Sequence, residues 1–281
     1  RGIRVQDLLN KDLFEKKVKA NVEETNLTLT KIYNQPPLVA EEIINEFNDY
    51  KDMVSNHVVD TSLLIDNAIK DQKSILFEGA QGTLLDIDHG TYPFVTSSNT
   101  SSGNAAIGSG VGPKNIDRIV GVTKAYISRV GSGPFVTEQK NEIGDYLIEK
   151  GAEFGVVTGR RRRCGWLDLV SLKYSVRVNS LTELFITKLD VLSGLEELQL
   201  CIGYNTENKV ITDYPYELTT LDSAEPVYET FGGWSDDISS IKNYEDLPEN
   251  AKTYLKAIED FIEVPITFIS VGPERTENII I

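Results

Sequence analysis

The sequence predicts an α/β protein in which a largely parallel, doubly wound sheet follows an N-terminal helical subdomain. Apolar side chains recur at helical spacing through residues 1–73, whereas from residue 74 onward short apolar runs of strand length alternate with helical patterns. Polar, glycine-rich turns follow several of these runs, as they do at the carboxyl ends of strands in open α/β sheets. We therefore expect a helical subdomain at 1–73 and a ligand-binding α/β part at 74–281.

The helical subdomain is expected to contain three helices. A second helix is predicted from Leu38 to Val54, and a third passes through Leu64 and Ile65 with Asp60 or Thr61 as its cap. The first helix is indicated by the near-helical recurrence of Val5, Leu8, Leu9, Leu13 and Val18.

In the α/β part, the apolar runs predict five strands and two principal helices. The strands are Ser74–Phe77, Arg118–Ser128, Glu183–Thr187, Leu198–Tyr204 and Ile266–Ser270. The helices are Leu167–Val178 and Pro248–Phe261, the second with proline suited to a first turn. Its apolar stripe consists of Ala251, Tyr254, Leu255, Ile258 and Phe261. The stretch Tyr214–Leu247 reads as irregular.

Composition excludes several classes of protein. With 40% hydrophobic and 25% charged residues, the 281-residue chain is of ordinary globular type. Its net charge of −15 argues against general binding to nucleic acid or anionic membranes. Cys164 and Cys201 form neither a disulfide framework nor a metal pattern, which fits a reducing cytosol. No signal peptide or membrane-spanning apolar run is present, and we expect a cytoplasmic protein.

Residues 78–99 form the most informative segment, because they follow an apolar run and are rich in glycine and polar groups. Glycines let the backbone approach a ligand, and amides or hydroxyls can bond a base edge or a phosphate. A ligand loop is favoured over a plain surface loop, since loops of this length are usually functional. Its early polar residues are Gln81, Thr83, Asp86 and Asp88, and it closes on Thr96-Ser97-Ser98-Asn99.

A guanine pocket is indicated where two further apolar runs end. Thr187-Lys188-Leu189-Asp190 follows one run, and Ser270-Val271-Gly272-Pro273 ends another. An aspartate carboxylate can accept hydrogen bonds from both guanine N1–H and the exocyclic amine, and a lysine stem can cover the purine ring. Taken alone, Asp190 would be read as a helix cap, but the two segments together favour guanine recognition.

Arg160 to Arg163 follow the glycine-containing run 155–159. Consecutive side chains diverge, so some of these arginines would face a site and others would form salt bridges elsewhere. Guanidinium groups bind carboxylates through two parallel hydrogen bonds and stay charged at any working pH. In an acidic chain, the run favours a loop that grips a small dianion over a solvated patch.

These segments together resemble the signature of adenylosuccinate synthetases, which use GTP to join L-aspartate to inosine monophosphate (IMP). The resemblance runs from Arg1 to Ile281 and implies a sheet like that of P-loop NTPases. It also implies a two-step ligase reaction of purine biosynthesis. GTP phosphorylates O6 of IMP, and the aspartate amino group then displaces phosphate to give adenylosuccinate.

The resemblance assigns roles to individual residues. For IMP, Gln81 would bind the base and polarise O6, Thr96 would bond the phosphate, and Val130 would lie by the ribose. A turn-stabilising amide is the alternative for Gln81. The aspartate contacts would be Thr158, Arg160 and Arg162, with Arg160 also at IMP. The guanine contacts would be Lys188, Asp190, Ser270, Gly272 and Pro273.

Arg1 and Arg4 sit where the family uses arginines near the subunit interface, one of which reaches the nucleotide phosphate of the neighbouring site of a homodimer. For Arg1 as an IMP contact, a solvated pair of arginines before a helix is an equal alternative. Asp86, Asp88 and His89 are expected to brace their loop rather than to bind metal or transfer protons.

The family's Gly-Asp-Glu-Gly-Lys-Gly-Lys phosphate loop does not occur in this sequence, which begins at Arg1 without methionine. The expectation is a C-terminal portion of the enzyme. The catalytic Asp and His, the phosphate loop and the Mg²⁺ ligands would then precede Arg1, and the isolated chain would be inactive. A purine-binding module without catalysis and a structural fragment with strand edges covered by a partner remain alternatives.

Overall fold

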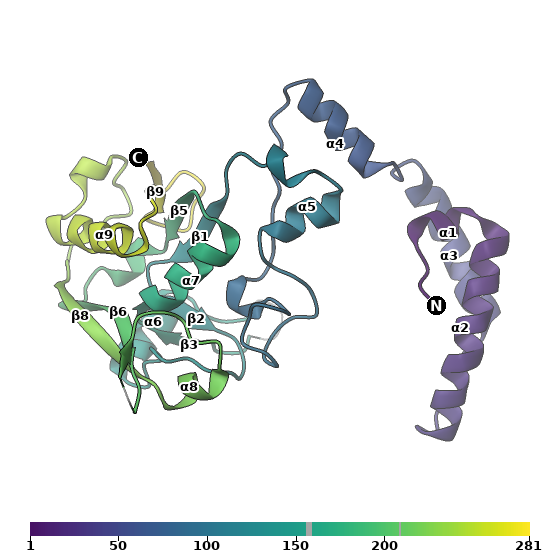
Figure 1. Ribbon diagram of the computed structural model, residues 1–281, viewed down its shortest axis with the longest axis horizontal. Coiled ribbons are helices and arrows are strands. Elements are labelled where there is room, and N and C mark those ends of the chain that lie inside the picture. The colour runs from purple at the N-terminus through teal and green to yellow at the C-terminus, as the bar shows by residue number, and fades with distance from the viewer. Residues whose placement is uncertain (156–158, 208) are drawn as a thin grey trace. The chain divides into compact units, whose positions relative to one another are not determined.

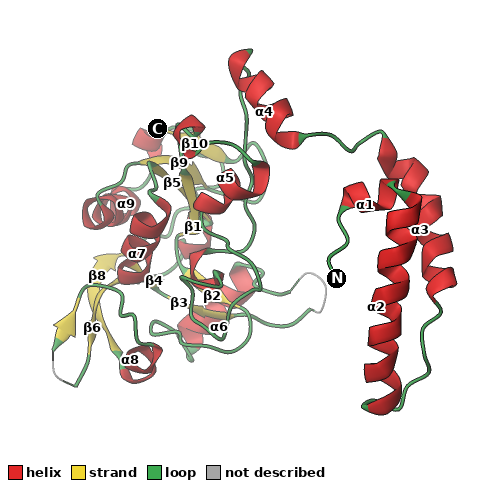
Figure 2. Cartoon of the chain, turned by 45° about the vertical axis from the view of Figure 1, so that its right-hand side comes forward, coloured by secondary structure: helices red, strands yellow, loops and turns green. Residues whose placement is uncertain are grey.

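The computed structural model describes residues 1–155, 159–207 and 209–281, which form two compact units, Arg1–Ser74 and Ile75–Ile281 (Figure 1). The first unit is helical, and the second combines helices with sheets (Figure 2).

The first unit contains four helices: α1 (Val5–Leu9), α2 (Lys11–Lys31), α3 (Ala40–Ser55) and α4 (Thr61–Lys70). Asn10 caps α2 by accepting from the backbone N–H of Leu13 at 3.2 Å. Asp60 caps α4 in the same way through the N–H of Leu63 at 3.1 Å, as the sequence predicted. Its core is small and consists of Phe14, Val18, Val22 and Ile44.

The main sheet of the second unit has the order β1-β5-β9-β10. Its strands are β1 (Val120–Lys124), β5 (Glu183–Thr187), β9 (Ile266–Ser270) and β10 (Asn278–Ile280). β1, β5 and β9 are parallel, and β10 runs antiparallel to β9. The carboxyl ends of the three parallel strands therefore meet at one edge of the sheet, where open α/β sheets bind their ligands.

Two smaller sheets complete the unit. In one, β6 pairs with β4, β7 and β8; the other is the antiparallel pair of β2 and β3. Their bounds are β2 (Ile127–Arg129), β3 (Arg163–Gly165), β4 (Leu167–Asp168), β6 (Glu197–Asn205), β7 (Val210–Ile211) and β8 (Glu225–Gly232). The helices are α5 (Gly103–Ser109), α6 (Glu142–Lys150), α7 (Leu169–Asn179), α8 (Leu218–Ser223) and α9 (Glu249–Ile262). Short 3-10 helices are η1 (Thr83–Leu85), η2 (Pro113–Asn115), η3 (Leu189–Leu192) and η4 (Tyr244–Asp246).

The main core lies between the sheets and helices α7 and α9, which pack against each other. Helix α9 begins after Pro248 and buries the predicted stripe, with Phe261 only partly covered. Tyr254 is fully buried, and its hydroxyl donates to the Ala125 carbonyl at 2.8 Å. The α/β prediction is thus confirmed, including the bounds of β5 and β9.

Several sequence predictions are wrong or incomplete. The first unit has four helices and not the expected three, because the run from Val5 to Val18 is divided into α1 and α2 at Asn10, which caps α2. Leu167 and Asp168, predicted to begin a helix, form strand β4. Residues 74–77 do not form a strand, since they pair with no strand in the described part of the chain, and Leu76 is 88% exposed. The strand predicted at Arg118–Ser128 is divided into β1 and β2, which belong to different sheets. The chain changes sheet at Ala125 and Tyr126, which are buried between the two strands.

The stretch Tyr214–Leu247 is not irregular, because it contains α8 and the strand β8. Strand β8 pairs with β6 over most of its length. The sequence does not reveal this strand, because it has no buried apolar run: its residues are half-buried or exposed without regular alternation, and Glu225 and Glu229 are charged. Pairing with a buried neighbour, rather than its own pattern, makes it a strand.

Candidate functional site

The segment predicted to hold IMP is organised around Asp86, which is fully buried. One carboxylate oxygen accepts from the backbone N–H groups of Asp88 and His89 at 2.9 and 3.0 Å. The other accepts from those of Thr100 and Ser101 at 2.6 and 3.0 Å. Burial by itself would raise the pKa of Asp86, but these hydrogen bonds outweigh it and hold the pKa well below its usual range. Asp86 therefore braces the loop, as the sequence predicted.

Helix α7 fastens the same segment. The Tyr174 hydroxyl donates to the His89 carbonyl at 2.7 Å. The Asn179 side chain donates to the Thr83 hydroxyl at 2.9 Å and accepts from the Ser102 N–H at 2.8 Å. These long-range bonds set the path of the loop that carries the predicted IMP contacts.

Gln81 and Thr96 lie at opposite ends of this segment. Gln81 is exposed and has a left-handed backbone, with φ of +65°. Thr96 is half-buried, and its N–H donates to the Leu85 carbonyl at 2.9 Å. Gln81 thus presents its amide to the surface from a constrained turn.

Arg129 ties the segment to the loop that carries Val130. Its guanidinium donates to the Thr91 hydroxyl at 2.9 Å and to the Phe94 carbonyl at 3.2 Å. It also donates to the Ser132 carbonyl at 3.1 Å. Val130 itself is 56% exposed, so the structure brings the predicted phosphate and ribose contacts onto neighbouring loops and leaves Val130 open to a ligand.

The arginine run diverges as expected. Arg160 is exposed, and its carbonyl accepts from the Gly155 N–H at 2.8 Å. Thr158, predicted to contact aspartate, and Val157 lie outside the described residues. The next three arginines each form a salt bridge with a different carboxylate: Arg161 with Asp145, Arg162 with Glu153 and Arg163 with Glu138.

Arg163 supports the site instead of facing it. Two of its nitrogens donate to the Glu138 carboxylate at 2.8 and 2.6 Å. A third donates to the carbonyls of Gly131 and Gly133 at 3.2 and 2.9 Å. The end of the arginine run therefore holds the Val130 loop in place.

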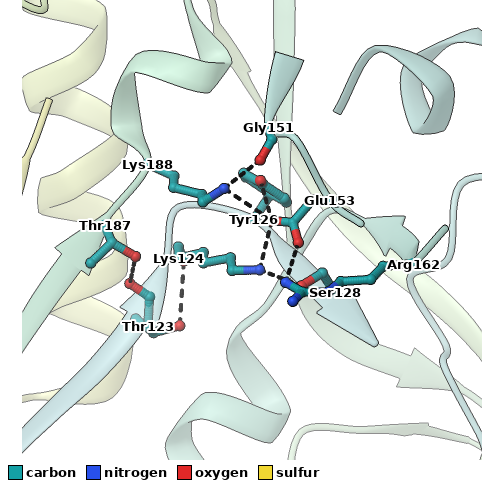
Figure 3. Close-up of polar contacts among 9 residues, drawn as sticks. All are labelled: Thr123, Lys124, Tyr126, Ser128, Gly151, Glu153, Arg162, Thr187 and Lys188. Atoms are coloured by element: carbon teal, nitrogen blue, oxygen red, sulfur yellow. Dashed lines mark hydrogen bonds and ion pairs between the residues drawn. The ribbon is translucent and has the colours of Figure 1, made fainter. Parts of the chain in front are cut away.

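Glu153 is a site residue that sequence reasoning missed. Its fully buried carboxylate accepts from Lys124 at 2.6 Å, Tyr126 at 2.5 Å and Arg162 at 2.8 Å. The Lys188 ammonium lies 3.5 Å from the same carboxylate. Figure 3 shows these four side chains converging on Glu153; we call the five residues the Glu153 cluster.

The charge state of the cluster follows from its hydrogen bonds. Burial would raise the pKa of Glu153, but the bonds from Lys124, Tyr126 and Arg162 together lower it to about 2. The carboxylate is therefore ionised at any physiological pH. The only sequence signal was a lone acidic residue shortly before the arginine run, which is too common a pattern to single out Glu153.

The two segments predicted to hold guanine do meet. Lys188 and Asp190 follow β5, Ser270 ends the parallel neighbour β9, and η3 packs against β9. The Lys188 ammonium donates to the Gly151 carbonyl, and its backbone is left-handed with φ of +59°. Asp190 is half-buried, and burial raises the pKa of its carboxyl.

Gly272 and Pro273 continue from β9 at the same edge. Gly272 is buried, and its carbonyl accepts from the Ser270 hydroxyl at 2.8 Å. A Cβ at Gly272 would overlap the Glu277 carboxylate, so a larger residue there would displace that side chain. Pro273 is exposed.

Arg1 belongs to the first unit, so its position is described within that unit alone. Its side chain pairs with Glu24, and its carbonyl accepts from Asn21 at 2.9 Å. The backbone N–H of Arg4 donates to Asp7 at 2.7 Å.

Among the residues that the structure describes, no three His, Cys, Asp or Glu side chains gather in a way that could hold a metal ion. In the same residues, no helix combines the length and apolar character needed to cross a membrane. Both cysteines are buried, and burial raises the pKa of each thiol to about 12.

The family model for adenylosuccinate synthetase matches residues 1–279. Curated adenylosuccinate synthetases from Halothermothrix orenii and Desulfatibacillum aliphaticivorans are 54% and 50% identical over 99% and 100% of this chain. The solved structure of fully ligated adenylosuccinate synthetase from Plasmodium falciparum is 41% identical, with a TM-score of 0.93 over the whole chain. The chain spans 65% of the length of both curated relatives and 66% of the solved chain. On these matches, this chain belongs to the adenylosuccinate synthetase family.

Proposed function

We propose that this chain carries the guanine, IMP and aspartate contacts of an enzyme that ligates L-aspartate to IMP at the expense of GTP. The observation that carries the proposal is the meeting of residues 187–190 and 270–273 at the carboxyl edge of the parallel sheet. Arg162 and Lys188, from two different predicted subsites, also lie on one buried carboxylate. These juxtapositions are what a compact site for several anionic substrates requires.

For guanine, Asp190 is the proposed reader of the base. Its half-buried carboxylate would accept from N1–H and the exocyclic amine, a donor pair that adenine lacks. Lys188, anchored through its ammonium on Gly151, would lay its methylene stem against the purine face. Ser270, Gly272 and Pro273 would form the opposite wall.

For IMP, Gln81, Thr96 and Val130 are the proposed contacts. Gln81 would donate to O6 while charge develops there, Thr96 would bond the phosphate, and Val130 would cover the ribose. The bonds of Arg129 to both loops support this arrangement. Arg160 is proposed as a further IMP contact, and Arg1 at the phosphate of a neighbouring subunit in a homodimer.

For aspartate, Thr158, Arg160 and Arg162 are the proposed contacts. A guanidinium offers two parallel donors to a carboxylate, and two arginines suit the two carboxylates of the substrate. Arg161 and Arg163 are not included, because their side chains pair with Asp145 and Glu138.

The reaction would begin with transfer of the GTP γ-phosphoryl group to O6 of IMP. Displacement of that phosphate by the aspartate amino group would then give adenylosuccinate, GDP and phosphate. Phosphoryl transfer needs a base at N1, an acid at the leaving group and Mg²⁺ on the phosphates. The family's phosphate-loop sequence does not occur in the chain. We therefore expect the isolated chain to bind substrates without turnover, and we expect the complete enzyme to work in the cytoplasm.

Calorimetry on this chain and on a version extended to the family's full length tests the proposal. The expected result is binding of GDP and IMP by both, with adenylosuccinate formed only by the extended version. GDP binding should weaken by roughly 10- to 100-fold in Asp190→Ala and stay unchanged in Asp88→Asn, an exposed carboxylate in another segment. Failure of the extended version to bind GDP or IMP would refute the assignment. Binding of both by the extended version without any turnover would identify a purine-binding module instead.

A further inference from the structure

We propose that Glu153 is a positioning residue that couples the guanine subsite to the aspartate subsite. The inference rests on the proposed function, since it needs Lys188 at guanine and Arg162 at aspartate. Its structural basis is the Glu153 cluster, in which one carboxylate contacts the side chains of both residues.

The backbone places Glu153 between the two subsites. Its carbonyl accepts from the Arg162 N–H at 2.9 Å, and the next residue, Phe154, forms an antiparallel bridge with Arg161. Two residues before Glu153, the Gly151 carbonyl accepts from the Lys188 ammonium. The short segment 151–154 is thus in contact with the arginine run on one side and with the guanine segment on the other.

The burial pattern distinguishes the carboxylate from its partners. The Glu153 side chain is 0% exposed, whereas Lys124, Arg162 and Lys188 are 24%, 28% and 36% exposed. The cations can therefore contact a ligand at the surface, while the Glu153 carboxylate that they share is shielded from solvent. Among the described residues, Lys124, Arg162 and Lys188 make ion pairs with no carboxylate other than Glu153.

Sharing one carboxylate makes the three cations interdependent. Like charges this close repel, and the repulsion is strong away from bulk water unless a negative charge lies between them. A purine stacked on the Lys188 stem would hold that ammonium against Gly151 and Glu153. The fixed carboxylate would in turn hold the Arg162 guanidinium in one orientation, ready for a substrate carboxylate.

Arg162 has capacity left for that substrate. One of its terminal nitrogens is bonded to Glu153. Its Nε is buried and has no hydrogen-bond partner within the described part of the chain. The side chain is thus fixed at one terminal nitrogen, and its exposed part, 28% of the side chain, is what a substrate carboxylate can reach.

Coupling of this kind is reciprocal, so GDP should tighten aspartate binding by the same factor by which aspartate tightens GDP binding. The test measures the dissociation constant of L-aspartate with and without saturating GDP, in the version extended to full family length. In the unsubstituted protein we expect GDP to tighten aspartate binding by roughly five- to tenfold, at the lower end of common coupling factors. In Glu153→Gln, which keeps the shape and removes the charge, this ratio should fall to about one while GDP affinity alone changes by less than about threefold.

Glu183→Gln is the matched control. Glu183 is another buried carboxylate with its pKa lowered to about 2, chiefly by Arg118, but it lies at the opposite end of strand β5. It should keep the coupling ratio of the unsubstituted protein. A ratio lost equally in both variants would indicate general loosening of the fold and would overturn the proposal.

If Glu153→Gln does not fold, Tyr126→Phe tests the coupling role of Glu153 instead. It removes only the hydroxyl that donates to Glu153 at 2.5 Å, and the coupling ratio should fall by about half or more. An unchanged ratio in either foldable variant would overturn the role of Glu153, as would the absence of coupling in the unsubstituted protein. If that protein binds neither GDP nor aspartate, the proposed function itself fails, which is a different result from binding without coupling.

Discussion

Replacing Asp86 by asparagine should open the loop that carries the proposed IMP contacts. The carboxylate accepts four backbone hydrogen bonds, two on each oxygen. An asparagine has the same shape but only one oxygen, so its NH₂ group must face two N–H donors in place of accepting from them. The N–H groups of Asp88 and His89, or those of Thr100 and Ser101, therefore lose their hydrogen-bond acceptor.

The expected cost can be worked out from these bonds. A hydrogen bond to a charged group contributes about 1.5–3 kcal/mol, so losing two costs about 3–6 kcal/mol before relaxation. Water can reach parts of an exposed loop and recover some of this, which leaves an expected cost of about 3 kcal/mol. Because the segment can open without global unfolding, hydrogen exchange at its amides should accelerate by about 100-fold.

Hydrogen exchange at the Thr100 and Ser101 amides, together with IMP affinity, measures the effect. Asp88→Asn is the control, because Asp88 is exposed and, within the described residues, its carboxylate accepts from Asn99 alone, at 2.6 Å. That control should change exchange by less than about threefold. The depressed pKa of Asp86 means that its contribution is present above pH 4 and is lost as the pH falls through the folded value. Exchange rates in Asp86→Asn that match those of the control would refute the bracing role.

Three further outcomes are expected. Burial raises the pKa of Asp168 to about 6, above the unfolded value near 4, so stability should fall by up to about 3 kcal/mol between pH 4 and 6 and then level off. Urea titrations should show this slope, and Asp168→Asn should remove it. Asp190→Ala should weaken GDP binding by roughly 10- to 100-fold in calorimetry, and a smaller loss would argue against two bonds to guanine. Gly151→Ala should destabilise the fold by about 1–3 kcal/mol, because its Cβ would overlap the Tyr126 hydroxyl and lie 2.5 Å from the Leu147 carbonyl. A Cβ in Gly79→Ala meets nothing within 4 Å, so this control should be close to neutral when the two variants are compared by thermal melting.

The elements best predicted from sequence are those whose own residues carry the burial pattern. Strands β5 and β9 are short apolar runs buried in a parallel sheet, and their bounds were predicted correctly. Helix α9 carries one apolar stripe, so its period identifies both the helix and the face it buries. Strand β8 could not be predicted, because pairing with β6 holds it in the sheet and its own residues carry no strand pattern.

The same distinction applies to the site. Residues 78–99, 187–190 and 270–273 could be predicted as ligand segments, because glycines and polar groups directly follow apolar runs. The partners of the arginine run could not be predicted, since Asp145, Glu153 and Glu138 are brought to it only by folding. Glu153 in particular has no local pattern that separates it from other surface-type glutamates.

The sequence by itself determined the α/β class, the family resemblance and the residue types offered to purine and carboxylate ligands, because local pattern and motif order are properties of the chain. Only the tertiary structure decided which charges share a counter-charge and which side chains brace a loop. The Glu153 cluster gathers residues from the end of β1, the segment after α6, the arginine run and the end of β5. Such contacts form only when segments distant in the sequence come together, and a buried charge is stable only where those segments bring opposite charges and hydrogen-bond donors to it.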